Sequence, residues 1–389
     1  MMNTLLRMTL IGLAFAATTP AIAQPVTAQS VVEHYATIVY ATYEDTLAAT
    51  KKMQQAIDAF IAKPSADTHK AAKTAWLAAR EYYGQTEAFR FYGGPIDGAD
   101  GPEARINSWP VDESYIDYVR DKPNSGIVNN LKIKINSKQL AALNTRGGEE
   151  NIATGWHAIE FLLWGQDFND KGPGDRAFTD YVDGKAANVA RRREYLKVVT
   201  AMLVDDLGTV TKAWQPKQKN FRARFVANPS EGLRRMFVGI GSLSRGEMAG
   251  ERLEVPLASQ DQEDEQSCFS DNTHRDLVSN AIGIENVWLG RYHRADGTTL
   301  KGPSLDALVA AKNAALAKQT TANVAATVAA AKALHPPFDQ EIRGDAKAPG
   351  RLRVQALIEA LKTQTKDFVA SAAAVGVTKL TMANPNKHR

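Results

Sequence analysis

The sequence predicts an all-α protein made of two helical bundles. Apolar residues recur at steps of three and four through the long segments, which is the spacing of one face of a helix. No stretch of any length alternates apolar and polar residues as a half-buried strand does. Short patterns also repeat between the two halves of the chain, which indicates two related bundles.

Residues 1–23 have the pattern of an export signal. Arg7 precedes an apolar run from Met8 to Ala17, and the small residues of Ala21-Ile22-Ala23 form a cleavage site. The run is far shorter than the roughly 20 residues of a membrane span, and no later stretch reaches that length. No cysteine follows the cleavage site to carry a lipid anchor. We therefore expect a soluble periplasmic protein without a membrane span.

Charge and cysteine content narrow the class of protein. The 47 Lys and Arg residues nearly balance the 43 Asp and Glu residues, and loss of Arg7 with the signal takes the formal charge from +4 to +3. Because the charges are dispersed, nucleic acid is not an expected partner. Cys268 is the single cysteine, so no intramolecular disulfide forms and the core must supply the stability. The 389 residues less the 23 of the signal leave 366, enough for two domains, which we place at 24–170 and 171–389.

A helical hairpin is expected at the start of the mature chain. Apolar residues spaced in threes and fours predict one helix over 31–60 and another over about 67–91, with Pro64 interrupting the pattern between them. The second helix carries charges among aromatic residues on one stripe. We expect Glu87 and Arg90 of this stripe to point into a cleft.

The connection from this hairpin to the middle of the chain is rich in Gly and Pro. Loops of this kind often grip ligands, and Asp97 lies among apolar residues within the passage 93–110. An ordinary connector is the alternative. A short helix over 112–119 and a polar, turn-rich segment over 121–148 follow.

The candidate site centres on the stretch 155–167. Every residue between Gly155 and Gly165 is apolar except His157 and Glu160, so a helix here is apolar on all sides and must be buried. Their spacing of three places both on one face, and a buried carboxylate needs a cation, a set of donors or a metal. Helical proteins build carboxylate-rich metal centres with this spacing. A structural pair that holds two helices together is the alternative reading, and the zinc-protease pattern His-Glu-x-x-His is absent.

Long helices alternate with polar links through the second half. The predicted helices cover about 184–214, 231–257, 273–289, 304–334 and 351–374. The acidic run 261–265 is interpreted as a solvated loop, and Asp271 or Thr273 is a possible cap of the helix that follows it.

The internal duplication is visible in the central helix. The segment 158–165 matches 283–290 in its Ile, its Glu and its final Gly. Ile282 stands where the first copy has His157, so only one half keeps the histidine. A histidine present in only one of the two copies is more easily explained by a function than by a requirement of the fold that both copies share.

These residues resemble a known family. The six residues Gly155-Trp156-His157-Ala158-Ile159-Glu160 match the Gly-x-His-x-x-Glu hallmark of the imelysin family, also called the M75 peptidase group. Further stretches similar to that family follow in order along nearly the whole mature chain, at 87–92, 94–98, 106–110, 259–265 and 268–272. The resemblance implies two helical bundles that arose by duplication, with the motif in the cleft between them. It also implies an exported, iron-regulated protein linked to iron uptake, and the founding member of the family was described as a protease.

A metal site is the expectation that follows. The predicted metal ligands are His157, Glu160, Glu87 and Asp97. The residues expected to line the cleft or to orient these ligands are Arg90, Asp112, Arg252 and Asp271. One imidazole with several carboxylates suits iron, and zinc or copper would also fit. The ion or a metal chelate is then the small-molecule partner, together with an envelope protein of iron uptake.

Two other functions remain open at this point. A metallopeptidase normally needs three protein ligands, an open water position and a general base. His157 and Glu160 supply at most two ligands, and a Glu160 bound to metal is not free to act as the base. The third candidate is a module that binds a small organic anion between Arg90 and Arg252, with a purely structural His–Glu pair.

Overall fold

Helices make up nearly the whole fold. The computed structural model describes residues 25–380, and the predicted export signal at 1–23 lies outside the described residues. Within 25–380 the strands are limited to one antiparallel hairpin of β1 (Arg291–His293) and β2 (Thr299–Lys301). The prediction of an all-α protein is therefore confirmed. None of the helices in this range is both long enough and apolar enough to cross a membrane.

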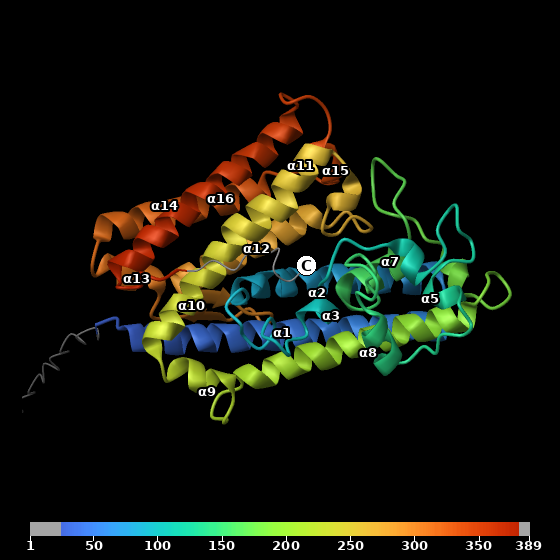
Figure 1. Cartoon of the computed structure of the whole chain (residues 1–389), viewed down its shortest axis with the longest axis horizontal. Helices are drawn as coiled ribbons and strands as arrows, with labels where there is room; N and C mark the ends of the chain where they lie inside the picture. The colour runs from blue at the N-terminus through green and yellow to red at the C-terminus, as the bar shows by residue number, and fades with distance from the viewer. Residues whose placement is uncertain (1–24, 381–389) are drawn as a thin grey trace, which may run out of the picture.

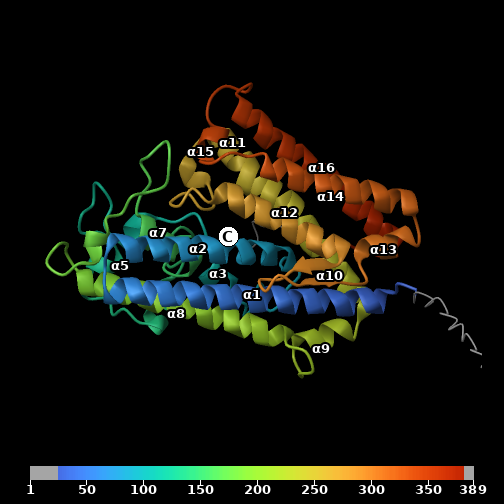
Figure 2. The same cartoon turned by 180° about the vertical axis from the view of Figure 1, so that it is seen from behind.

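The long helices lie in two groups, which Figures 1 and 2 show from opposite sides. The first group consists of α1 (Ala28–Ala62), α2 (Ala66–Thr86) and α8 (Val189–Trp214). The second group consists of α10 (Pro229–Ser242), η3 (Leu243–Glu254), α12 (Thr273–Leu289), α14 (Ala314–Lys332) and α16 (Pro349–Ala374). The shorter helices are η1 (Glu87–Phe89), α3 (Glu103–Ile106), α4 (Glu113–Ile116), α5 (Gly126–Asn129), α6 (Ser137–Leu143), α7 (Gly155–Trp164), η2 (Phe178–Tyr181), α9 (Phe221–Val226), α11 (Val255–Ser259), η4 (Gln262–Asp264), α13 (Leu305–Ala310) and α15 (Asp339–Ile342).

The first group begins with the helical hairpin expected from the sequence. Helix α1 packs against α2 on one side and against α8 on the other (Figure 1). Both helices of the hairpin begin at a capping box, in which the side chain of Thr27 or Ser65 accepts a hydrogen bond from the N–H three residues on. These local signals fix where each helix begins.

The helix predicted over 231–257 forms, but its middle is wound as a π-helix. Helices α10, η3 and α11 follow one another directly, and the 12 residues of η3 are the π-helical part. Such winding is rare and is found frequently at functional sites. Here η3 carries Glu247 and Arg252, and both side chains are buried.

The two groups approach each other most closely where α2 meets α12. A Cβ at Gly283 of α12 would lie 2.4 Å from the carbonyl oxygen of Gln85, so only glycine fits this contact. A buried ion pair of 2.8 Å between Arg80 of α2 and Asp276 of α12 joins the same two helices.

Some helix boundaries differ from those predicted. The helix expected from about residue 184 begins at Val189. The helix expected over 304–334 is divided into α13 and α14, because the side chain of Asn313 accepts a hydrogen bond from the N–H of Leu316 and starts a new helix there. The internal duplication and the domain boundary near residue 170 stay predictions.

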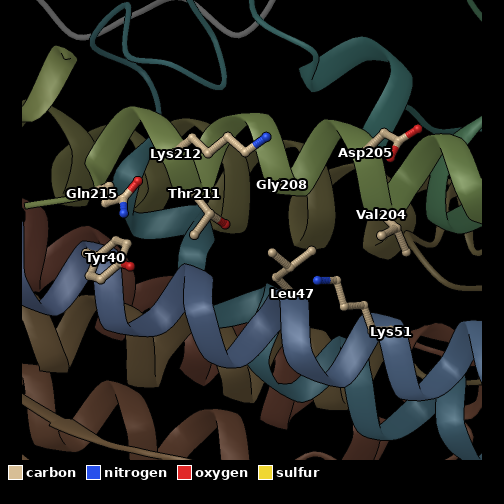
Figure 3. Close-up of a pocket in the computed structure, with 9 residues that line it drawn as sticks. All are labelled: Tyr40, Leu47, Lys51, Val204, Asp205, Gly208, Thr211, Lys212 and Gln215. Carbon is tan, nitrogen blue, oxygen red and sulfur yellow. The ribbon is translucent and has the colours of Figure 1, made fainter. Parts of the chain in front are cut away.

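A pocket of about 280 Å³ lies between α1 and α8 (Figure 3). Lys51 of α1 and Lys212 of α8 line it, and Gly208 lies on its α8 side. A Cβ at Gly208 would meet nothing within 4 Å. Unlike Gly283, this glycine is therefore not required by packing.

These two glycines make a matched pair of variants. We expect Gly283→Ala to lower the free energy of unfolding by about 1–3 kcal/mol, because the new methyl group overpacks the α2–α12 contact. We expect Gly208→Ala to raise it by about 0.5–1 kcal/mol through better helix propensity. Urea unfolding measures the free energy of unfolding of each variant. Equal changes in the two variants would contradict the conclusion that the α2–α12 contact requires glycine at position 283.

Candidate functional site

Helix α7 lies in the interior, as its apolar composition predicts. All 10 of its residues are buried. Gly155 at its start has a φ of +88°, and a Cβ there would lie 2.4 Å from the carbonyl oxygen of Ile106. Gly165 ends the helix with a φ of +73°. The first glycine of the Gly-x-His-x-x-Glu motif is therefore needed for the close approach of the chain at the end of α3.

His157 and Glu160 form the polar pair within this helix. Nδ1 of His157 lies 2.7 Å from Oε2 of Glu160, and the two residues are only 1% and 0% exposed. The other carboxylate oxygen, Oε1, accepts hydrogen bonds from the backbone N–H of Ser270 at 2.9 Å and from its hydroxyl at 2.6 Å. The pair is thus held from both ends by α7 and by the segment before α12.

Burial decides the protonation of the pair. It lowers the pKa of His157 to about 3, and the nearby guanidinium of Arg80 acts in the same direction. Burial also raises the pKa of Glu160 to about 8, against the hydrogen bonds from Ser270. At neutral pH the imidazole is therefore uncharged and the carboxyl group keeps its proton.

One ring nitrogen of His157 has no partner. Nε2 is buried and meets no hydrogen-bonding group among the described residues. When Glu160 loses its proton, Nδ1–H donates to the carboxylate and Nε2 presents a lone pair. In that state the ring has the arrangement of a metal-binding histidine, whose second nitrogen donates to a carboxylate.

Glu87 lies in a second buried network. It accepts hydrogen bonds from Arg252 and, at 2.9 Å, from Arg90. Although burial opposes ionisation, these two guanidinium groups lower the pKa of Glu87 to about 2. Arg90 also binds Glu103 at 2.9 Å, and Arg252 also binds Glu247 at 2.9 Å. Each of the two arginines therefore already has two carboxylate partners.

Two further predicted residues stabilise their own loops. Asp97 accepts hydrogen bonds from the N–H groups of Phe91 and Gly94, the second at 2.7 Å. Asp112 caps α4 by accepting from the N–H of Ser114 at 2.9 Å. Both carboxylates thus have backbone partners in this structure.

A group of buried carboxyl groups surrounds the last predicted residue, Asp271. Oxygen atoms of Asp271, Glu265 and Asp339 are buried without a hydrogen-bond partner among the described residues. Burial and the neighbouring acidic groups raise the pKa of Asp167 to about 6 and that of Asp271 to about 8. The interpretation of 261–265 as a solvated loop is wrong for Glu265, which is 2% exposed.

The predicted site residues thus fall into separate sets. His157 and Glu160 meet, whereas Glu87 joins the two arginines and Asp97 braces a loop. Among residues 25–380, no three His, Cys, Asp or Glu side chains are arranged so that they could hold a metal ion. The four-residue ligand set stays a prediction.

A cavity of about 660 Å³ lies beside the pair. Ser270, which holds Glu160, lines this cavity together with Asp271 and His274. Helix α2 and the loop 171–173 form other parts of its wall. The cavity has the size of a site for a small molecule.

The matching segment of the second half lacks this chemistry. Glu285, at the position of Glu160, binds Arg291 at 2.7 Å, and Ile282 replaces His157. Of the two matching segments, only the first carries a His–Glu pair.

Comparison with known families gives one match over most of the chain. The model for imelysin, the M75 peptidase family, matches residues 39–368. A relative named iron-regulated protein A, from Synechococcus elongatus, is 26% identical over 270 residues. That alignment covers 67% of this chain and 63% of the relative.

Solved structures share the fold. A putative iron-regulated protein A precursor from Parabacteroides distasonis has a TM-score of 0.69 and 19% identity, with 91% of this chain and 97% of that chain covered. An imelysin-like protein from Psychrobacter arcticum has a TM-score of 0.61 and 16% identity, with 91% and 98% covered. At these identities the likeness concerns the fold alone.

The hydroxyl of Ser270 gives a pH-dependent test of the pair. Its bond favours the ionised form of Glu160, so Ser270→Ala should destabilise the protein by about 1 kcal/mol above about pH 8.5 and by less near pH 6. Ser267→Ala is the matched control, because it removes a hydroxyl bound to Asp276 in the same segment. Urea unfolding at both pH values measures this, and an equal loss for Ser270→Ala at both would contradict the protonation of Glu160.

Proposed function

Because the chain belongs to the imelysin family, we propose that it is an exported protein that binds iron in the periplasm and serves its uptake or handling. The buried Nε2 of His157, which lacks any hydrogen-bond partner among the described residues, is the observation that carries this proposal. The name of the Synechococcus relative, iron-regulated protein A, supports the connection to iron. The signal pattern at 1–23 supports export, and an envelope protein of iron uptake would be the partner that receives the metal.

His157 and Glu160 have different proposed roles in metal binding. His157 is the proposed ligand through Nε2, and Glu160 accepts the hydrogen bond from Nδ1–H, which orients the ring and increases its basicity. Ser270 in turn fixes the carboxylate of Glu160. Glu160 therefore contributes to metal binding by orienting His157, whether or not its own carboxylate also contacts the metal.

Further ligands must come from carboxylates. Glu87 and Asp97 remain the proposed candidates, and each would have to exchange a present partner, Arg252 or a backbone N–H, for the metal. A mixed set of one imidazole and several carboxylates favours iron, while zinc and copper would also be accepted.

Peptidase activity is the second candidate function, and the family name is its support. Hydrolysis by a zinc centre would require a third protein ligand and a free general base beside His157 and Glu160. The binding role needs no free general base, and for that reason we favour it.

Metal content tests the ligand directly. We expect the protein, stripped with chelator and reloaded with iron, zinc or copper, to retain about one ion, and His157→Gln to retain none, because the free lone pair is lost. His69→Gln is the matched control, since His69 is also buried and its Nε2–H donates a hydrogen bond to the backbone carbonyl of Leu163 at 2.8 Å. Equal retention by the two variants in elemental analysis would refute the assignment of His157.

Proton release tests the role of Glu160. Since the pKa of Glu160 is about 8 without metal, binding at neutral pH should release about one proton, and affinity should rise about tenfold per pH unit until about pH 8. In Glu160→Gln the amide still bonds to His157 but has no proton to release, so the affinity should be weaker and its dependence on pH nearly flat over this range. Calorimetry in buffers of different ionisation enthalpy counts the protons. A wild-type protein that releases none at neutral pH would contradict the proposal.

A further inference from the structure

We propose that one end of the first group of helices docks on an anionic phospholipid surface, independently of metal binding. The docking surface is formed by residues 122–148, which we call the basic segment. These residues include five Lys or Arg and no Asp or Glu, so they carry more positive charge than the formal +4 of the whole chain. The rest of the chain is therefore close to neutral, and the excess positive charge lies in this one segment.

The five basic side chains of the segment are free to meet a partner. All of them are exposed, and none forms an ion pair with another of the residues 25–380 that the structure describes. By contrast, Arg234 and Arg235 of α10 both pair with Glu231 at 2.7 Å. Positive charge that no carboxylate of the protein neutralises attracts an anionic surface. The five residues are Lys122, Lys132, Lys134, Lys138 and Arg146.

Leu131 is the exposed apolar residue of the basic segment. It is 72% exposed, the largest value among the large hydrophobic residues that the structure describes. The apolar residues around it are placed differently, because Ile127 and Val128 are buried and Ile133 and Ile135 pack against the core. The fold thus buries or covers the neighbours of Leu131 and leaves Leu131 itself in solvent.

Hydrogen bonds from α8 fix this exposure. Nε of Arg191 donates to the carbonyl oxygen of Val128 at 2.7 Å, and Nη2 of the same side chain lies 2.9 Å from each of three further carbonyl oxygens of the stretch. Two of the four carbonyl groups directly flank the turn, one of them at Asn130, and another lies beyond Leu131 at Ile133. Leu131 cannot turn inward without a loss of these bonds.

The basic segment lies at one end of the molecule. Figures 1 and 2 place α5, which begins the stretch before Leu131, at the end of the long axis beside the start of α8. Helices α5 and α6 both belong to the segment, and both pack against α8. A position at the end of an elongated molecule allows the segment to meet a flat surface.

An exposed leucine beside lysines suits a lipid surface. The leucine can insert at the boundary between headgroups and acyl chains, while Lys132 and Lys134 keep their ammonium groups at the level of the phosphates. Each further basic side chain near the surface adds to the attraction. A nucleic acid would use the lysines alone and leave Leu131 in water. A lipid surface therefore explains both the charge and the exposed leucine.

Co-sedimentation with vesicles tests the docking. The chain is used from Gln24 onward, because the apolar run within 1–23 would itself bind lipid. We expect it to bind vesicles of phosphatidylethanolamine and phosphatidylglycerol but not vesicles of phosphatidylcholine, and about 0.5 M salt should release it by screening. Lys132→Gln/Lys134→Gln should lower the affinity about 25-fold, at about fivefold for each lysine. Leu131→Ser should lower it about tenfold, because less apolar surface is buried.

Matched variants near α14 and α16 are the controls. Lys312→Gln/Lys318→Gln removes two exposed lysines that have no ion-pair partner among the described residues, and Leu352→Ser changes a leucine that is 53% exposed. Both should bind vesicles as wild type does. The docking surface is refuted if wild type does not bind the phosphatidylglycerol vesicles, if it binds phosphatidylcholine equally well, or if the controls lose as much affinity as the segment variants. Metal binding at His157 is unaffected by any of these results, because no residue of the basic segment takes part in it.

Discussion

Burial of an imidazole and a carboxyl group in one fully enclosed helix is the constraint on which the rest of the structure depends. Helix α7 is apolar on every other side, so it must be covered, and its two polar side chains must then find partners inside the protein. Glu160 obtains them from Ser270, and His157 obtains one from Glu160. Nε2 of His157 remains without any among the described residues, and it is the atom that we propose as the metal ligand.

The surrounding fold keeps this interior closed. The two groups of helices meet through buried ion pairs that cross between them, Arg80 with Asp276 and Arg252 with Glu87. Removing one partner of such a pair leaves the other charge buried without compensation, which typically lowers the free energy of unfolding by several kcal/mol. Arg252 belongs to the π-helical η3 and forms a buried ion pair with Glu87. The π-helix thus supplies one partner of an ion pair that joins the two groups of helices.

The sequence predicts the helices and the buried pair because both depend on local patterns. The apolar surroundings of His157 and Glu160 are visible in ten consecutive residues. The partners are not visible in this way, since Ser270 lies 110 positions from Glu160 and Arg252 lies 165 positions from Glu87. Glu265 follows a polar, acidic run, and its burial is signalled only by Cys268 and Phe269 just after it. Residue type alone makes Glu87 and Asp97 candidate ligands. Their hydrogen bonds to arginine side chains and to backbone N–H groups depend on the path of the chain, which local patterns do not reveal.

X-ray absorption spectroscopy at the iron edge tests the central claim most directly. On protein loaded with iron and freed of any chelator, the account predicts one imidazole nitrogen among the nearest neighbours of the metal, with oxygen atoms in the other positions. The imidazole signal should be absent from His157→Gln loaded under the same conditions. A wild-type spectrum of oxygen neighbours alone, or an imidazole signal unchanged in His157→Gln, would contradict the assignment of His157 as the ligand.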